Sequence, residues 1–145
     1  MISEEELAFS AVNGLQPTGT TGQVTYVLLA EDDKALRRYL EVVLERAGYV
    51  VDSAADGLEA MKLLLCKKID LVVTDAVMPN LNGYELCRFI RSTGKLSDLP
   101  VILLSALDPK NSVAEFEQAD AFLAKPVSPE NLLQTLLDLQ NRVRK

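Results

Sequence analysis

Acidic, hydroxyl-bearing and basic residues stand at the ends of apolar stretches of this sequence. Glu31 and Asp32 follow the first such stretch, Asp75 ends a second, and Ser105 and Lys125 end two more. Carboxylates that gather in one place repel one another, and one of them takes up a proton unless a cation lies among them. Mg²⁺ fits such a cluster because it binds one or two carboxylates together with water and phosphate oxygens. The pattern therefore predicts a magnesium site in which Lys125 is a further cation.

Each of these residues also has a structural explanation when it is considered alone. Asp33 directly precedes a helical pattern and has the side chain of an N-cap residue. Ser105 could be an ordinary polar residue at the end of a strand, and Lys125 a solvated lysine in a loop. The coincidence of such residues at the ends of four separate apolar stretches favours a shared site over four independent explanations.

The elements that must position these residues follow from the hydrophobic pattern. Short apolar or β-branched stretches predict five strands, at 24–30, 49–54, 69–75, 99–106 and 120–125. Amphipathic patterns predict helices at 34–47, 57–67, 84–93 and, more weakly, 110–118, and a last helix with Ser128 as N-cap and Pro129 in its first turn. Gly48 is the expected end of the first helix, and Asp56 the expected cap of the second. Alternating strands and helices predict an α/β fold, a doubly wound parallel sheet of five strands covered by five helices on both faces.

Ligands of such sheets bind at the carboxyl ends of the strands, where the order of connections reverses. The candidate residues stand at these ends in the sequence. We therefore expect the acids, Ser105 and Lys125 to meet at one edge of the sheet.

Length, composition and charge exclude several classes of protein. The 145 residues suffice for one domain, and 48% hydrophobic with 25% charged residues is ordinary for a globular protein. We find neither a secretory signal nor an apolar run near the roughly 18 residues of a membrane-spanning helix, so we expect a cytoplasmic protein. A net charge of −6 argues against direct binding to nucleic acid. The absence of histidine excludes a histidine-based triad, a histidine-ligated metal and a phosphohistidine donor within this chain.

The ends of the chain and its two cysteines complete this outline. Residues 1–23 are rich in Gly and Thr toward residue 23 and are predicted to form a flexible N-terminal arm, so the domain itself occupies 24–145. Cys66 and Cys87 lack the spacing of a zinc site or of a disulfide framework, and we expect both to be free thiols in the core.

Four motifs carry a resemblance to a known family. The segments LLAEDD, VVTDAVMPNLNGYE, VILLSA and AFLAKPV occur in this order, with the spacing found in the receiver domains of two-component response regulators. The resemblance extends from residue 24 to about residue 142. It implies a flavodoxin-like fold, that of the stand-alone chemotaxis regulator, with strand order 2-1-3-4-5.

The resemblance also implies roles for the acids. Asp75 would accept a phosphoryl group from a sensor histidine kinase or a histidine phosphotransfer protein. Asp32, Asp75 and the backbone carbonyl of Val77 would bind Mg²⁺, with Mn²⁺ as an alternative. Glu31 would support these ligands without binding the metal ion directly. Phosphoryl transfer depends on a metal, a cation and positioning more than on covalent chemistry by the protein, and these residues supply such groups.

The remaining site residues would contact the phosphoryl group or change position when it is present. Lys125 would pair with one phosphoryl oxygen, and the Ser105 hydroxyl would donate a hydrogen bond to another. The peptide bond between Lys125 and Pro126 is often cis in this family. Movement of Ser105 toward the phosphoryl group would free space for the Phe122 ring and change a surface that binds a downstream protein, whose identity the sequence does not give.

Departures from the family pattern lead to further expectations. Gln118 stands where relatives usually have Gly, so the predicted helix at 110–118 is expected to be short or irregular. Ala121 and Thr135 replace charges through which winged-helix transcription regulators of this superfamily dimerise, so we expect a monomer or a weak dimer. We also expect no DNA-binding domain after residue 145. Val77 and Leu107 are apolar at positions beside the path of the attacking water, which predicts a slowly decaying aspartyl phosphate.

Two other functions compete with this interpretation. A pseudo-receiver, which binds partners without being phosphorylated, usually lacks an acid, the acceptor or the lysine, and this chain has all of them. A magnesium-dependent phosphatase with an aspartyl nucleophile, like the haloacid dehalogenases, requires a second Asp two residues after the first, where this chain has Val77. The sequence leaves open whether the chain acts alone or belongs to a longer regulator or hybrid kinase, and its starting Met slightly favours the first.

Overall fold

A parallel β-sheet lies at the centre of the computed structural model, which describes residues 24–106 and 118–143. Its strands run in the order β2-β1-β3-β4-β5. Their bounds are Tyr26–Ala30 (β1), Val50–Ala54 (β2), Leu71–Asp75 (β3), Val101–Ser105 (β4) and Ala121–Ala124 (β5). The five-stranded parallel sheet and its order confirm the expected fold. The strands are one to three residues shorter than predicted, because the apolar stretches continue into the adjoining turns.

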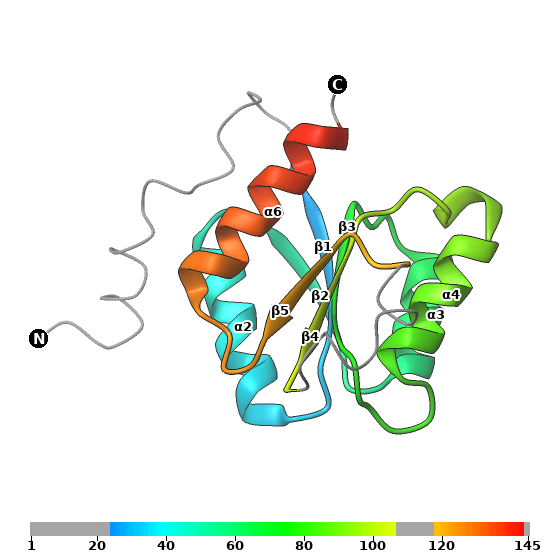
Figure 1. Ribbon diagram of the computed structural model, residues 1–145, viewed down its shortest axis with the longest axis horizontal. Helices are drawn as coiled ribbons and strands as arrows, with labels where there is room; N and C mark the ends of the chain where they lie inside the picture. Colours follow the sequence, from blue (N-terminus) through cyan, green and yellow to red (C-terminus); the bar gives the residue numbers. More distant parts are fainter. Residues whose placement is uncertain (1–23, 107–117, 144–145) are drawn as a thin grey trace, which may run out of the picture.

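Helices cover both faces of the sheet (Figure 1). Helices α2 (Lys34–Arg46) and α6 (Pro129–Val143) lie on one face, and α3 (Gly57–Cys66) and α4 (Gly83–Ser92) lie on the other. A short 3-10 helix, η2 (Gly94–Leu96), follows α4. The described residues thus contain four of the five predicted helices. The helix expected at 110–118 falls almost entirely on residues 107–117, which lie outside the described part, as do the predicted arm at 1–23 and residues 144–145.

Alternate residues of each strand pack into two separate cores. On β1, Val27 and Leu29 belong to the cluster under α2 and α6, whereas Leu28 and Ala30 belong to the cluster under α3 and α4. All four side chains are fully buried. Successive side chains of a strand point to opposite faces of its sheet, so a strand covered on both faces must be apolar throughout. This is why the strands are continuous apolar runs in the sequence.

The predicted helix caps are present, with one shift in position. The Asp33 side chain accepts from the Leu36 amide at 3.0 Å, and the Asp56 side chain accepts from the Glu59 amide at 2.8 Å. Gly48 follows α2 with a positive φ of 101°, which suits the end of a helix. Helix α4 begins one residue earlier than predicted, at Gly83, because Asn82 and Glu85 form a capping box at its start.

The cysteines are free, but only one of them lies in the core. Cys87 is buried on α4, as expected, and Cys66 is exposed. The prediction was wrong for Cys66 because side chains two positions apart on a helix point to nearly opposite sides. The buried position on that turn of α3 belongs to Leu64.

Gly83 allows the start of α4 to pack against the end of β3. A Cβ atom at this position would overlap the backbone carbonyl oxygen of Asp75 and crowd the Cα atom of Ala76. The Gly83 amide donates to the Ala76 carbonyl at 2.9 Å and so closes the loop between β3 and α4. Ala76, the residue that follows the end of β3, is therefore held by backbone contacts.

Replacing Gly83 with Ala is expected to lower the free energy of unfolding by about 1–3 kcal/mol, the usual cost of overpacking a tight contact. The atoms that the new methyl group meets belong to backbone and cannot rotate away. Chemical denaturation measures the effect. Gly94→Ala is the matched control, because an added Cβ there meets nothing within 4 Å, and it should change stability by less than about 0.5 kcal/mol. Equal stability of the two variants would contradict the packing argument.

Candidate functional site

Three acidic residues meet at the carboxyl edge of the sheet. Strands β1 and β3 are neighbours with Ala30 opposite Thr74, so Glu31 and Asp32 lie beside Asp75. One carboxylate oxygen from each of Glu31, Asp32 and Asp75 lies within 4.8 Å of the other two. Glu31 and Asp75 are buried, whereas Asp32 is exposed. The structure thus brings together the acids that the sequence singled out.

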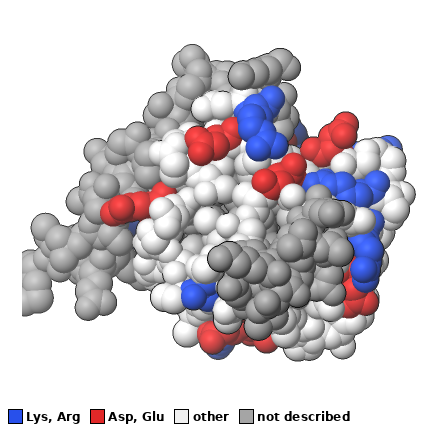
Figure 2. Space-filling model, viewed as in Figure 1, with Lys and Arg blue, Asp and Glu red and all other residues white. Residues whose placement is uncertain are grey.

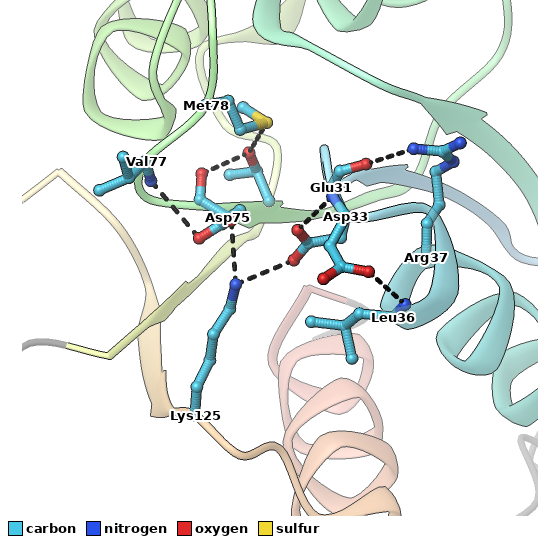
Figure 3. A network of polar contacts seen from close by, with 9 residues as sticks. Glu31, Asp33, Leu36, Arg37, Asp75, Val77, Met78 and Lys125 are labelled. Carbon is cyan, nitrogen blue, oxygen red and sulfur yellow. Dashed lines mark hydrogen bonds and ion pairs between the residues drawn. The ribbon is translucent and has the colours of Figure 1, made fainter.

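Lys125, which follows the outermost strand β5, contacts this acidic group. Its Nζ atom lies 2.9 Å from Oδ2 of Asp75 and 3.1 Å from Oε1 of Glu31 (Figure 3). The backbone amide of Lys125 donates to the Ser105 carbonyl at 2.9 Å, which fixes where the lysine leaves β5. The peptide bond from Lys125 to Pro126 is cis, as the resemblance led us to expect. Lys125 therefore connects the ends of three strands, β1, β3 and β5.

Glu31 is held on several sides. Its amide donates to the Ala54 carbonyl at 3.0 Å, and its Oε2 atom accepts from the Asp33 amide at 3.0 Å. Burial raises the pKa of the Glu31 carboxyl to about 7, and the nearby charge of Asp75 acts in the same direction. The hydrogen bonds from Asp33 and Lys125 favour the ionised form and oppose this shift of the pKa. Negative charge on Glu31 is thus disfavoured by burial and favoured by its hydrogen-bond partners.

The Lys125 ammonium responds in the opposite way. Burial alone would lower its pKa, but the hydrogen bonds to Asp75 and Glu31 and the charges of these two residues outweigh burial and raise the pKa above its ordinary value. Lys125 therefore stays protonated and keeps its positive charge beside the acids.

The sequence also assigned Ser105, Phe122 and Val77 to this site. Ser105 is buried at the end of β4, one position past Leu104, which pairs with Asp75. The alternation along β4 and β5 places Ser105 and Phe122 on the same face of the sheet, and Phe122 is partly exposed. Val77 is 64% exposed, and its amide lies 3.4 Å from Oδ1 of Asp75. Leu107, the other predicted neighbour of the site, lies outside the described residues.

Two further contacts at the carboxyl edge of the sheet were not foreseen from the sequence. Arg37 on α2 donates from Nη1 to the Glu31 carbonyl at 2.8 Å. Asn80, in the loop after β3, donates from Nδ2 to Asp56 at 2.9 Å and has a positive φ of 71°. The one available signal was the Asn in a loop, since Asn tolerates the left-handed region better than most residues. An arginine one turn inside a helix gives no comparable signal.

The donor set fits a hard divalent cation. The carboxylates of Glu31, Asp32 and Asp75 carry more negative charge than the single ammonium group of Lys125 offsets. All the gathered acceptors are oxygens, which Mg²⁺ prefers. Asp32 is exposed, so the acidic group is open to solvent on that side. A metal ion that keeps several water ligands is therefore well suited to this place.

Comparison with known proteins assigns the chain to a family. The sequence model of the response regulator receiver domain matches residues 27–137. The chain belongs to the response regulator receiver family. The response regulator MprA of Mycobacterium ulcerans is 39% identical over 120 residues, which are 81% of this chain and 51% of that protein. MprA of Mycobacterium sp. (strain KMS) is 42% identical over 118 residues, 80% of this chain and 50% of that protein.

Solved structures of receiver domains are similar to this one. The receiver domain of a signal transduction histidine kinase from Syntrophus aciditrophicus has a TM-score of 0.78 and 33% identity, with 84% of this chain and 94% of that chain covered. Chemotaxis response regulator CheY4 of Vibrio cholerae has a TM-score of 0.76 and 30% identity, with 81% and 99% covered. Response regulator TrrA of Thermotoga maritima, solved in complex with Mg²⁺ and BeF, has a TM-score of 0.73 and 30% identity, with 80% and 99% covered.

This receiver domain is a signalling domain of two-component systems. The chain spans about half the length of the curated relatives it matches. The expectation that it does not bind nucleic acid directly therefore rests on the charge of this chain alone. On the face shown in Figure 2, described acidic and basic side chains are interspersed and form no continuous basic surface. Within the described residues, each helix is too short or too polar to cross a membrane.

Replacing Lys125 with Met is expected to destabilise the metal-free domain, because it leaves the buried carboxylates of Asp75 and Glu31 without their ammonium partner. Removing one partner of a buried pair costs about 3–5 kcal/mol. The Lys125 side chain is 23% exposed, so we expect a smaller loss of about 1–3 kcal/mol.

Chemical denaturation in EDTA, repeated with Mg²⁺, measures this loss. Magnesium should reduce it, because the metal ion offsets the same negative charge. Lys95→Met, which removes an equal charge from an exposed position, is the control and should have little effect. A Lys125→Met domain as stable as this control in EDTA would show that the ion pairs do not stabilise the site.

Proposed function

We propose that this receiver domain accepts a phosphoryl group on Asp75 from the phosphohistidine of a sensor kinase or of a phosphotransfer protein, in a reaction that requires Mg²⁺. One observation carries the proposal. The ammonium group of Lys125 lies 2.9 Å from the Asp75 carboxylate, within a group of acids that matches the chemistry of a magnesium site. A charged nucleophile, a fixed cation and a metal-binding edge are what phosphoryl transfer needs from a protein.

In the proposed transfer, one carboxylate oxygen of Asp75 forms a bond to phosphorus as the phosphorus–nitrogen bond of the donor breaks. The electron pair of that bond stays on the imidazole nitrogen of the donor. The Lys125 ammonium leaves part of its present contact with Asp75 and pairs with a phosphoryl oxygen, and the Ser105 hydroxyl donates a hydrogen bond to another. Both groups offset the charge that the three phosphoryl oxygens bring into the site.

Asp32, Asp75 and the backbone carbonyl of Val77 would hold the metal ion, and Glu31 would support these ligands without binding the ion directly. Bound Mg²⁺, or Mn²⁺ in its place, would neutralise negative charge on the transferring group. Asp32 is the exposed acid of the three, so it can reach a hydrated ion from solvent. Glu31 is buried and already bound to Lys125 and to the Asp33 amide, which suits a supporting role better than direct coordination.

Phosphorylation would then change a protein-binding surface. The phosphoryl group would draw the Ser105 hydroxyl toward it, and the Phe122 ring would move into the space left behind. Support for this step comes from their position, since both residues lie on the same face of neighbouring strands. The surface would bind a downstream protein, and the domain would act as a monomer or a weak dimer.

Treatment with acetyl phosphate and Mg²⁺ tests the acceptor. The intact protein should gain the mass of one phosphoryl group, and both Asp75→Asn and an excess of EDTA should abolish the gain. Asp33→Asn is the matched control, since it changes an equal charge near the site at a residue that caps α2. A pseudo-receiver would gain no mass, and a phosphatase would release inorganic phosphate over many turnovers. Either result would overturn the proposal.

The aspartyl phosphate is expected to decay slowly, because Val77 is exposed beside Asp75 and has no group that can orient water. Loss of the label within seconds in Mg²⁺ at neutral pH would contradict this expectation. Val77→Asn introduces a side chain that can orient water and should speed the loss by roughly tenfold, less than a well-positioned general base provides. Val77→Ile keeps an apolar side chain and should stay slow. Mass measurement over time after removal of acetyl phosphate gives both rates.

A further inference from the structure

Arg37 makes a contact that the family motifs do not account for. It lies on α2, one turn past the acids, and its guanidinium group reaches back to the end of β1 (Figure 3). Its Nη1 atom donates to the backbone carbonyl of Glu31 at 2.8 Å, in a partly buried position. We propose that Arg37 is a positioning residue of the magnesium site, an inference that rests on the function proposed above.

The contact acts on the peptide group that joins Glu31 to Asp32. A peptide group is planar, so a hydrogen bond to the Glu31 carbonyl oxygen fixes the plane from which the Asp32 backbone continues. On the other side of Asp32, the Asp33 amide donates to Oε2 of Glu31 at 3.0 Å, and the Asp33 carbonyl accepts from the Arg37 amide at 2.8 Å. The Arg37 guanidinium thus holds the peptide group before Asp32, and the Glu31 carboxylate holds the peptide group after it. The contact of Arg37 with the Glu31 carbonyl sets the direction in which the Asp32 carboxylate leaves the chain.

The charge of Arg37 and its positioning role predict opposite changes in magnesium affinity when Arg37 is removed. Arg37 carries a positive charge close to a cation site, so its removal would strengthen magnesium binding if only charge mattered. If Arg37 positions Asp32, its removal weakens binding. Arg38 is the matched control because it is the next residue of the same helix and carries the same charge. Its side chain is 69% exposed, and its ion pair with Glu41, at 3.2 Å, lies within α2.

Calorimetric titration of the full chain with MgCl₂, at one fixed ionic strength, tests the proposal. Arg37→Ala should bind Mg²⁺ about tenfold more weakly than the unchanged chain, in line with the loss of a group that orients a metal ligand. Arg38→Ala should bind equally well or slightly more tightly. Arg37→Lys keeps the charge and one donor, and it should recover part of the affinity.

A second measurement separates positioning from general stability. In the metal-free state, the backbone amide signals of Asp32 and Asp33 in NMR spectra should shift or broaden in Arg37→Ala, and those of β4 should not. Magnesium binding by Arg37→Ala that equals binding by Arg38→Ala would overturn the proposal and leave the proposed function intact. If Arg37→Ala does not fold, Arg37→Lys decides in its place, and unchanged affinity with unchanged amide signals at Asp32 would overturn the proposal. Failure of the unchanged chain to bind Mg²⁺ would instead refute the proposed function.

Discussion

The ion pairs of Lys125 with Asp75 and Glu31 are the interactions on which the rest of the site depends. Two buried carboxylates close together cost several kcal/mol in free energy unless a cation lies beside them. Lys125 supplies that cation at 2.9 and 3.1 Å, from a position 50 and 94 residues away in the sequence. One ammonium group offsets only part of the negative charge of the three acids. This incomplete compensation makes the site a suitable place for a metal ion and a phosphoryl group to meet.

The sheet makes this arrangement possible because it is rigid and buried on both faces. Alternate residues of β1, β3 and β4 fill one core under α2 and α6 and another under α3 and α4. Each strand end is thereby fixed, and a side chain that follows it begins from a fixed point, as a preorganised site requires. The loop after Asp75 is fixed as well, by the capping box of α4, by Gly83 against the Asp75 carbonyl and by Asn80 on Asp56.

Membership of the response regulator receiver family and the geometry of the site support each other through separate evidence. The family match rests on sequence over residues 27–137. The geometry shows that the acids and the lysine of the motifs contact one another in this chain. The contact of Arg37 with the Glu31 carbonyl adds a residue outside these motifs and gives the exposed Asp32 a defined direction. An exposed acid that is proposed as a metal ligand most needs such support, because packing does not hold its side chain.

The sequence by itself determined the strands, their order through the resemblance, most helix caps and the set of residues at the site. These features depend on local patterns, such as continuous apolar runs, N-cap residues before helices and polar groups at strand ends. Only the tertiary structure decided that Cys66 is exposed, that Asn80 contacts Asp56 and that Arg37 reaches Glu31. Each of these features depends on which side of a helix or loop faces a neighbouring element. That neighbour is either distant in the sequence or separated by a turn. A local pattern does not contain that information, because packing of the whole sheet with its helices sets it.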